Sequence, residues 1–238
     1  MNDVLGEFLG TMILILLGDG VVAGVLLGRT KAKDAGWVAV TAGWAFAVMA
    51  GVYTARAVGG PQVGYINPVG PLVGVLTGNL GIEKAAAYAA AEFWGAFAGA
   101  VLVWLHYLPH WEETTDPAAK LAVFCTAPAI RRLPANVLSE AIATFVLVFV
   151  GTAIVEKEIG RGFVAPIVGV LVWGIGLSLG ATTGYAINPA RDLGPRCAHA
   201  VLPIPGKGPS DWEYAWVPVV GPIVGGLIAA AVAKVAFV

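Results

Sequence analysis

The dipeptide Asn-Pro occurs twice in this chain, as Asn67-Pro68 and Asn188-Pro189. The two pairs lie in near-copies of one phrase, residues 64–69 (GYINPV) and 184–190 (GYAINPA). Asn is a strong helix N-cap, and Pro is favoured at the first helical position because no backbone N–H is needed there. Each pair therefore predicts the start of a helix.

Two helix starts that face one another inside a membrane would form a polar constriction. Each N-terminus presents unsatisfied N–H groups and about +0.5 of an elementary charge. Cations and protons would meet an electrostatic barrier there, a device that water and solute pores use. The side-chain amides of Asn67 and Asn188 would offer donors to a passing oxygen. The duplication favours such a pore over two ordinary caps in re-entrant loops.

An arginine follows the second motif, in the run Asn188-Pro189-Ala190-Arg191-Asp192. An Arg inside a membrane is costly and is a functional candidate by default. Its five donors and fixed charge suit it to binding hydroxyl oxygens and repelling cations. Asp192 is in a position to orient a loop or to offset the charge. A structural arginine that pairs with lipid headgroups is the less favoured alternative.

The composition is that of a membrane protein. Of 238 residues, 58% are hydrophobic and only 12% are charged, with a mean hydropathy of +0.81. A soluble domain of this size carries about 25% charged residues. The net charge of −1 gives no case for a nucleic-acid partner. Cys125 and Cys197 form no metal spacing, and two free thiols are favoured over a disulfide.

Hydrophobic segments of about 20 residues predict spanning helices. Two further apolar segments, 67–78 and 188–200, are too short to span, and each begins at an Asn-Pro. Short segments in matching positions of two halves indicate a pore built from half-helices. Six segments are long enough to span: 4–27, 36–58, 84–107, 135–156, 162–182 and 214–236.

The two halves of the chain resemble one another. Glu7 opens the first span and Glu140 the fourth, each followed four residues later by Thr. Three spans per half is an odd number, so the second half must be inverted relative to the first. The expected organisation is a first repeat over 1–107, a polar, Pro-rich connector over 108–134 and a second repeat over 135–238.

The positive charges do not settle the orientation. With a cytoplasmic N-terminus, nine of the 14 Lys and Arg residues would lie outside and five inside, whereas Lys and Arg normally concentrate inside. The outer set is Arg29, Lys31, Lys33, Lys120, Arg131, Arg132, Arg191, Arg196 and Lys207.

The second phrase, continued as GYAINPARDLGPR over 184–196, resembles the second signature of the aquaporin superfamily, in particular its bacterial glycerol-facilitator branch. The resemblance covers the whole chain, including both Asn-Pro motifs, Glu7 and Glu140. One departure is Val69, where the family usually has Ala. The resemblance implies an all-α membrane protein with six transmembrane helices and two half-spanning re-entrant helices in an inverted repeat.

The resemblance also implies roles for particular residues. Glu7 and Glu140 would accept hydrogen bonds from the re-entrant loops, and Asp192 would support its own loop. Trp37, Trp111, Trp212 and Trp216 are expected to be interfacial aromatics, while Asp19 and Glu92 receive no role. The expected selectivity filter is Trp44, Gly176, Tyr185 and Arg191, with room at Gly176 that a His would fill. The expected central constriction is Asn67, Pro68, Val69, Asn188, Pro189 and Ala190.

These features predict a passive channel for glycerol and similar small uncharged solutes, with water. A channel tuned to water or to undissociated lactic acid is the alternative of the same fold. A proton-coupled transporter lacks titratable groups in the expected lining, and no nucleophile–base pair suggests an enzyme. No metal or cofactor is expected. The resemblance implies a homotetramer in the cell membrane with cytoplasmic termini.

Overall fold

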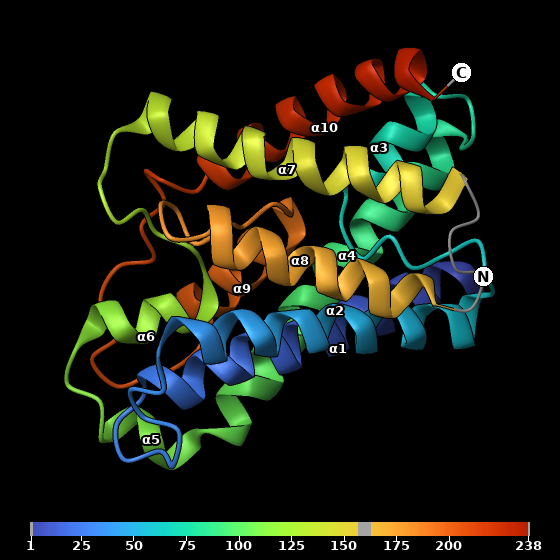
Figure 1. The fold of residues 1–238 in the computed structure, drawn as a ribbon. Coiled ribbons are helices and arrows are strands. Elements are labelled where there is room, and N and C mark those ends of the chain that lie inside the picture. Colours follow the sequence, from blue (N-terminus) through green and yellow to red (C-terminus); the bar gives the residue numbers. More distant parts are fainter. Residues whose placement is uncertain (1, 157–162, 238) are drawn as a thin grey trace.

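The structure is a computed structural model that describes residues 2–156 and 163–237. Within these ranges the protein is built from α-helices and loops, without strands (Figure 1). The helices are α1 (Asn2–Leu26), α2 (Gly36–Gly59), α3 (Val69–Leu76), α4 (Ile82–His106), α5 (Leu108–Glu112), α6 (Pro117–Phe124), α7 (Leu133–Glu156), α8 (Val164–Leu179), α9 (Pro189–Val201) and α10 (Val217–Ala236).

Five helices are long and apolar enough to cross a membrane, namely α1, α2, α4, α7 and α10. The fifth predicted span corresponds to α8, which has 16 residues and follows the part of the chain that is not described. Its predicted first residue, 162, lies outside the described residues. The long helices and α8 run along one bundle, and both chain ends lie at the same end of it (Figure 1).

The packing repeats itself in the two halves. In the first half α1 contacts α2 and α4, and in the second half α7 contacts α8 and α10. The halves meet where α2 packs against α8 and where each short helix reaches a long helix of the other half, α3 against α10 and α9 against α4. The structure therefore has the predicted inverted-repeat fold, with the two short helices held at the interface between the halves.

Glycines allow the matching helix pairs to approach closely. A Cβ added at Gly95 of α4 would lie 2.3 Å from the Phe8 carbonyl oxygen of α1, and one at Gly225 of α10 would lie 2.1 Å from that of Ala141 in α7. Backbone contact of this kind is how helices associate in membranes, where the hydrophobic effect gives no drive between them. The high glycine content thus serves the same contact in both halves.

The two short helices begin differently. Asn188 caps α9 as predicted, since its Oδ1 accepts from the backbone N–H groups of Ala190 and Arg191 at 3.0 and 3.1 Å. The first helix was predicted to begin at Asn67, but α3 begins only at Val69. Asn67 Oδ1 still accepts from the Val69 N–H at 3.1 Å. The side chain of Asn67 therefore accepts one backbone hydrogen bond at the first helix start, whereas that of Asn188 accepts two at the second.

Residues of the connector fold into two short helices, α5 and α6, at the end of the bundle opposite the termini (Figure 1). Asp116 caps α6 by accepting from the Ala118 N–H at 2.8 Å. Trp111 is only 1% exposed and stacks on Phe124 with ring centroids 5.5 Å apart. The expectation that Trp111 is an interfacial aromatic is therefore wrong, because its ring fills the core of the connector.

The unusual Val69 is accommodated by a glycine on the facing helix. Val69 is 1% exposed, and a Cβ added at Gly226 of α10 would lie 2.2 Å from its Cγ1. We expect Gly226→Ala to destabilise the protein by about 1–3 kcal/mol, as overpacking of a tight core does. The double variant Gly226→Ala/Val69→Ala should recover most of that loss. Thermal unfolding in detergent measures both, and additive losses would contradict this account.

Candidate functional site

Glu7 holds the loop that leads into the first Asn-Pro motif. Its side chain is fully buried, and its two oxygens accept backbone N–H bonds from Gly64 at 2.6 Å, Tyr65 at 3.0 Å and Ile66 at 2.8 Å. A buried carboxylate is tolerated only when several donors surround it. The geometry places Glu7 where the sequence predicted a loop support.

Glu140 makes the matching contacts in the second half. It accepts from the Thr183 hydroxyl at 2.6 Å and from the N–H groups of Ala186 and Ile187 at 3.0 and 2.8 Å. Only 1% of Glu140 is exposed. Each re-entrant loop is thus fastened to the first long helix of its own half by one carboxylate.

The residue before each Asn has the same strained backbone. Ile66 and Ile187 both have φ of 45°, which is rare for a β-branched side chain. This conformation aims each carbonyl at the other half, where Ile66 O accepts from Asn188 Nδ2 at 2.7 Å and Ile187 O accepts from Asn67 Nδ2 at 2.8 Å. Strain of this kind persists where the surroundings fix it, commonly at functional sites. The two motifs therefore lock one another across the inverted repeat.

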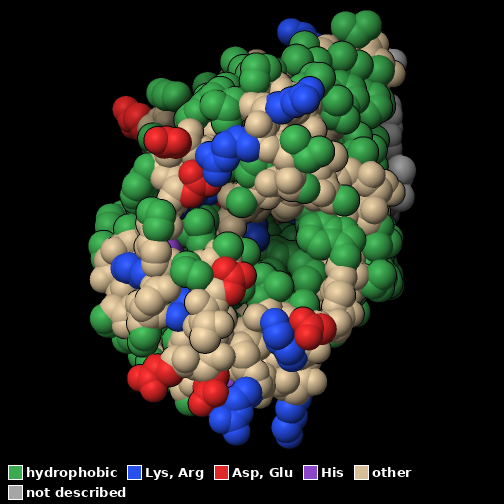
Figure 2. Space-filling view, turned by 90° about the vertical axis from the view of Figure 1, so that its left-hand side faces the viewer, with side chains coloured by type: hydrophobic (Ala, Val, Ile, Leu, Met, Phe, Trp, Pro, Cys, Tyr) green, Lys and Arg blue, Asp and Glu red, His purple; other side chains and the backbone are tan. Residues whose placement is uncertain are grey.

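A narrow cavity runs past these motifs. It has a volume of about 90 Å³, and its lining includes Asn67, Asn188, Trp44, Tyr185 and Arg191. A wider vestibule of about 640 Å³ adjoins it on the side of α3 and shares part of its lining. From the opposite end, Figure 2 shows a hollow with mainly hydrophobic walls and charged side chains around it. Two residues of the predicted constriction, Asn67 and Asn188, and three of the four predicted filter residues therefore line one cavity, while Val69 lines the vestibule.

Arg191 is held from two directions. Its Nη1 donates to Asp19 Oδ1 and to the Phe124 carbonyl oxygen, both at 3.2 Å, and its guanidinium carbon lies 4.0 Å from the centre of the Trp44 ring. No described residue accepts a hydrogen bond from its Nε or Nη2. Arg191 itself lines the cavity. Sequence reasoning gave Asp19 no role, although an acid between two glycines inside a span was a signal that it needed a partner.

Gly176 has a different place from the one predicted. It does not line the cavity, and the room beside it is filled by Tyr185, since an added Cβ would lie 2.9 Å from that residue's Cζ and hydroxyl oxygen. Trp37 completes this corner, because its Nε1 donates to the Gly176 carbonyl at 3.0 Å and its ring meets Tyr185 edge-on at 5.8 Å. Trp37, expected only as an interfacial aromatic, therefore supports the Tyr185 side of the cavity.

Asp192 ties the connector to α9. Its Oδ2 accepts from the backbone N–H and the hydroxyl of Thr126 at 2.8 and 2.7 Å, and its Oδ1 accepts from Arg196 Nε at 2.9 Å. Arg196 in turn donates to the Thr126 carbonyl at 3.1 Å. Both side chains are fully buried. These contacts of Asp192 thus join the connector to α9 and do not reach the loop before Asn188, and its carboxylate is occupied by partners other than Arg191.

Glu92 adds a second carboxylate to the first loop. This residue, which had no predicted role, accepts from the backbone N–H of Asn67 at 3.1 Å.

A lysine closes the far end of α9. Lys207 Nζ donates to the carbonyls of His199, Ala200 and Leu202 at 2.7–2.8 Å. Burial lowers the pKa of this amino group. Among the described residues no cluster of His, Cys, Asp and Glu is able to hold a metal ion.

Comparison with known proteins gives consistent relatives over the whole chain. A glycerol uptake facilitator protein 3 from Lactiplantibacillus plantarum is 54% identical over 96% of this chain and 94% of its own length. A probable glycerol uptake facilitator from Thermotoga maritima is 52% identical over 97% of both. The crystal structure of the Plasmodium falciparum aquaglyceroporin superposes with a TM-score of 0.85 at 26% identity, covering 99% of this chain and 96% of that one. The major intrinsic protein family model matches residues 1–233, and the chain belongs to that family.

Proposed function

We propose that this multi-pass membrane protein is a passive channel for glycerol and similar small uncharged solutes, and that water passes with them. The observation that carries the proposal is the composition of the narrow cavity. Trp44 and Tyr185 give it an apolar side, while Arg191 gives it a polar side with donors that no described residue uses. A small polyol has one edge of carbon and one of hydroxyl groups, which matches such a lining.

Permeation through this channel makes and breaks no bond, so no enzymatic step is proposed. A solute entering the filter exchanges its water for hydrogen bonds to Arg191 and then meets Asn67 and Asn188. Each Asn amide has two N–H groups, of which one is used in the lock between the halves, so one donor remains for the solute. Donors and two helix N-termini around one point disfavour cations and protons.

The repeat boundaries 1–107, 108–134 and 135–238, a homotetramer and cytoplasmic termini belong to the same proposal. The charge count that spoke against this orientation loses its force once buried cations are set aside. Arg191, Arg196 and Lys120 are at most 6% exposed, and Lys207 is bound to three carbonyls, so four of the nine outer cations are parts of the fold. Five remain outside, which equals the number of cations expected inside, namely Arg56, Lys84, Lys157, Arg161 and Lys234.

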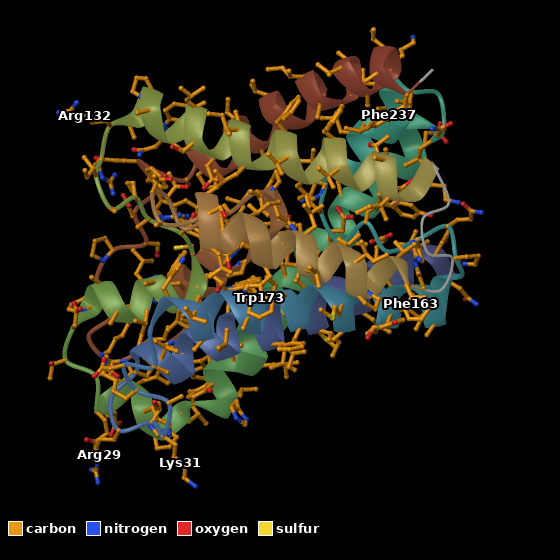
Figure 3. All side chains as sticks on the ribbon, in the orientation of Figure 1. Arg29, Lys31, Arg132, Phe163, Trp173 and Phe237 are labelled. Atoms are coloured by element: carbon orange, nitrogen blue, oxygen red, sulfur yellow. The ribbon has the colours of Figure 1, made fainter. Side chains whose placement is uncertain are left out.

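Three of those five, Arg29, Lys31 and Arg132, point away from the bundle at the end opposite the termini (Figure 3). Within the inner set Lys157 and Arg161 lie outside the described residues. The remaining balance no longer opposes cytoplasmic termini.

Flux measurements in proteoliposomes test the proposed function. Light scattering under a glycerol gradient should show permeability well above that of protein-free vesicles. Trp44→Ala should open the filter and raise the permeability of four- and five-carbon polyols relative to glycerol several-fold, because the ring that narrows the cavity is lost. Trp212→Ala, at a side chain that is 51% exposed, is the matched control.

A glycerol flux equal to that of empty vesicles would refute the channel. An unchanged polyol ratio in Trp44→Ala would refute the filter assignment alone. Including water and undissociated lactic acid in the same panel decides between glycerol and the alternative solutes.

A further inference from the structure

A short segment of α1 forms the back wall of the filter. A Cβ added at Gly18 would lie 2.3 Å from the Trp44 ring, so the glycine lets that ring lie against α1. The next residue, Asp19, reaches Arg191, and the carbonyl of Gly20 accepts from the Tyr107 hydroxyl at 3.0 Å. The filter therefore depends on a helix that contributes no residue to the predicted filter set.

Asp19 is the acid available to Arg191. It is fully buried, and its Oδ1 lies 3.2 Å from Arg191 Nη1, while no described residue donates to its Oδ2. The other nearby acid, Asp192, is occupied by Thr126 and Arg196. A buried carboxylate without a cation is strongly unfavourable. The two charges are thus each other's partners, across 172 positions of sequence.

We propose that Asp19 is the counter-ion that cancels the formal charge of Arg191 in the filter, and that this pairing sets the discrimination of the channel between neutral solutes and small anions. The inference rests on the proposed channel function. An unpaired guanidinium beside the narrow cavity would attract anions, since the Coulomb energy of a charge rises steeply where water is scarce. With Asp19 behind it, Arg191 keeps its outward donors for hydroxyl oxygens but presents no net charge to the solute.

The substitution Asp19→Asn separates charge from geometry. Asparagine has the same shape and keeps an oxygen that accepts from Arg191 Nη1, so the contact that positions Arg191 is retained while the negative charge is lost. The charge of the filter rises by one. Nitrate permeability, measured in vesicles under a potassium nitrate gradient with valinomycin to carry potassium, should rise relative to glycerol by about tenfold or more.

Glu113→Gln is the matched control, because it removes one acid that pairs with Arg29 and makes no contact with Arg191. Its nitrate-to-glycerol ratio should equal that of the unmodified protein. If Asp19→Asn fails to give folded protein in detergent, Asp19→Ala is measured in the same way and should also raise the ratio. An unchanged ratio in the folded variant overturns the role of Asp19. Absence of glycerol flux in the unmodified protein would instead overturn the channel function itself.

Discussion

Replacing Asn188 with aspartate is expected to abolish glycerol flux and to destabilise the protein by several kcal/mol. The Asn188 amide donates to the Ile66 carbonyl oxygen at 2.7 Å. An aspartate would place a carboxylate oxygen there, and the two acceptor oxygens would repel one another. The carbonyl of Ile66, aimed across the interface by its positive φ, would lose its donor.

The same substitution leaves the helix start intact, which makes its effect specific. Aspartate accepts from the N–H groups of Ala190 and Arg191 as well as asparagine does, so α9 keeps its cap. A loss of flux would therefore come from the broken contact between the halves. Asn67→Asp should behave alike, because its amide makes the reciprocal bond to Ile187 O.

Glycerol flux and thermal unfolding in detergent measure both effects. Asn79→Asp is the control, since Asn79 is exposed beyond the end of α3, in the wall of the wide vestibule, and its side chain donates to the nearby Thr77 hydroxyl. Near-normal flux in Asn188→Asp would show that the two motifs need no lock to form the constriction.

Features set by local sequence were predictable in this chain. Hydrophobic length indicated the spans, Asn-Pro indicated the start of α9, and the paired Glu7 and Glu140 indicated where the loops are fastened. The spans and the helix start follow from hydrophobic length and capping within one segment, whereas the loop contacts of Glu7 and Glu140 were implied by the resemblance to the aquaporin superfamily. The family match confirms the resemblance that these motifs carried.

Contacts between distant segments were not predictable. Nothing local indicates that Asp19 meets Arg191, that Trp37 donates to Gly176, or that the space for Val69 lies at Gly226. Such pairs depend on how α1, α8 and α10 are placed by the whole bundle. Gly176 illustrates the difference, because the sequence suggested spare room for a solute there, whereas the structure places the Tyr185 ring beside it and leaves Gly176 out of the cavity lining.

The two halves also differ in how their loops are held. The first loop is fastened by two carboxylates, Glu7 and Glu92, and the second by Glu140 with the Thr183 hydroxyl among its donors. An inverted repeat therefore does not require equal contacts. The second loop therefore depends on the carboxylate of Glu140 alone, whereas in the first loop Glu92 accepts a further backbone N–H beside the three that Glu7 accepts.

This difference leads to the other large expected effect. Glu140→Ala should destabilise the protein by about 3–9 kcal/mol and eliminate glycerol flux, because each of three buried donors left without an acceptor costs about 1–3 kcal/mol. Without those bonds the strained Ile187 would relax, and its carbonyl would no longer meet Asn67.

Glu92→Ala should cost less than Glu140→Ala, because it removes the acceptor of one backbone N–H while Glu7 still holds the other three donors of its loop. Glu213→Ala, at an exposed position, should leave stability and flux unchanged. Thermal unfolding in detergent and vesicle flux rank the three variants. Equal losses for Glu140→Ala and Glu92→Ala would mean that the carboxylates act through their charge in the membrane, whereas the expected order means that they act through the N–H groups they hold.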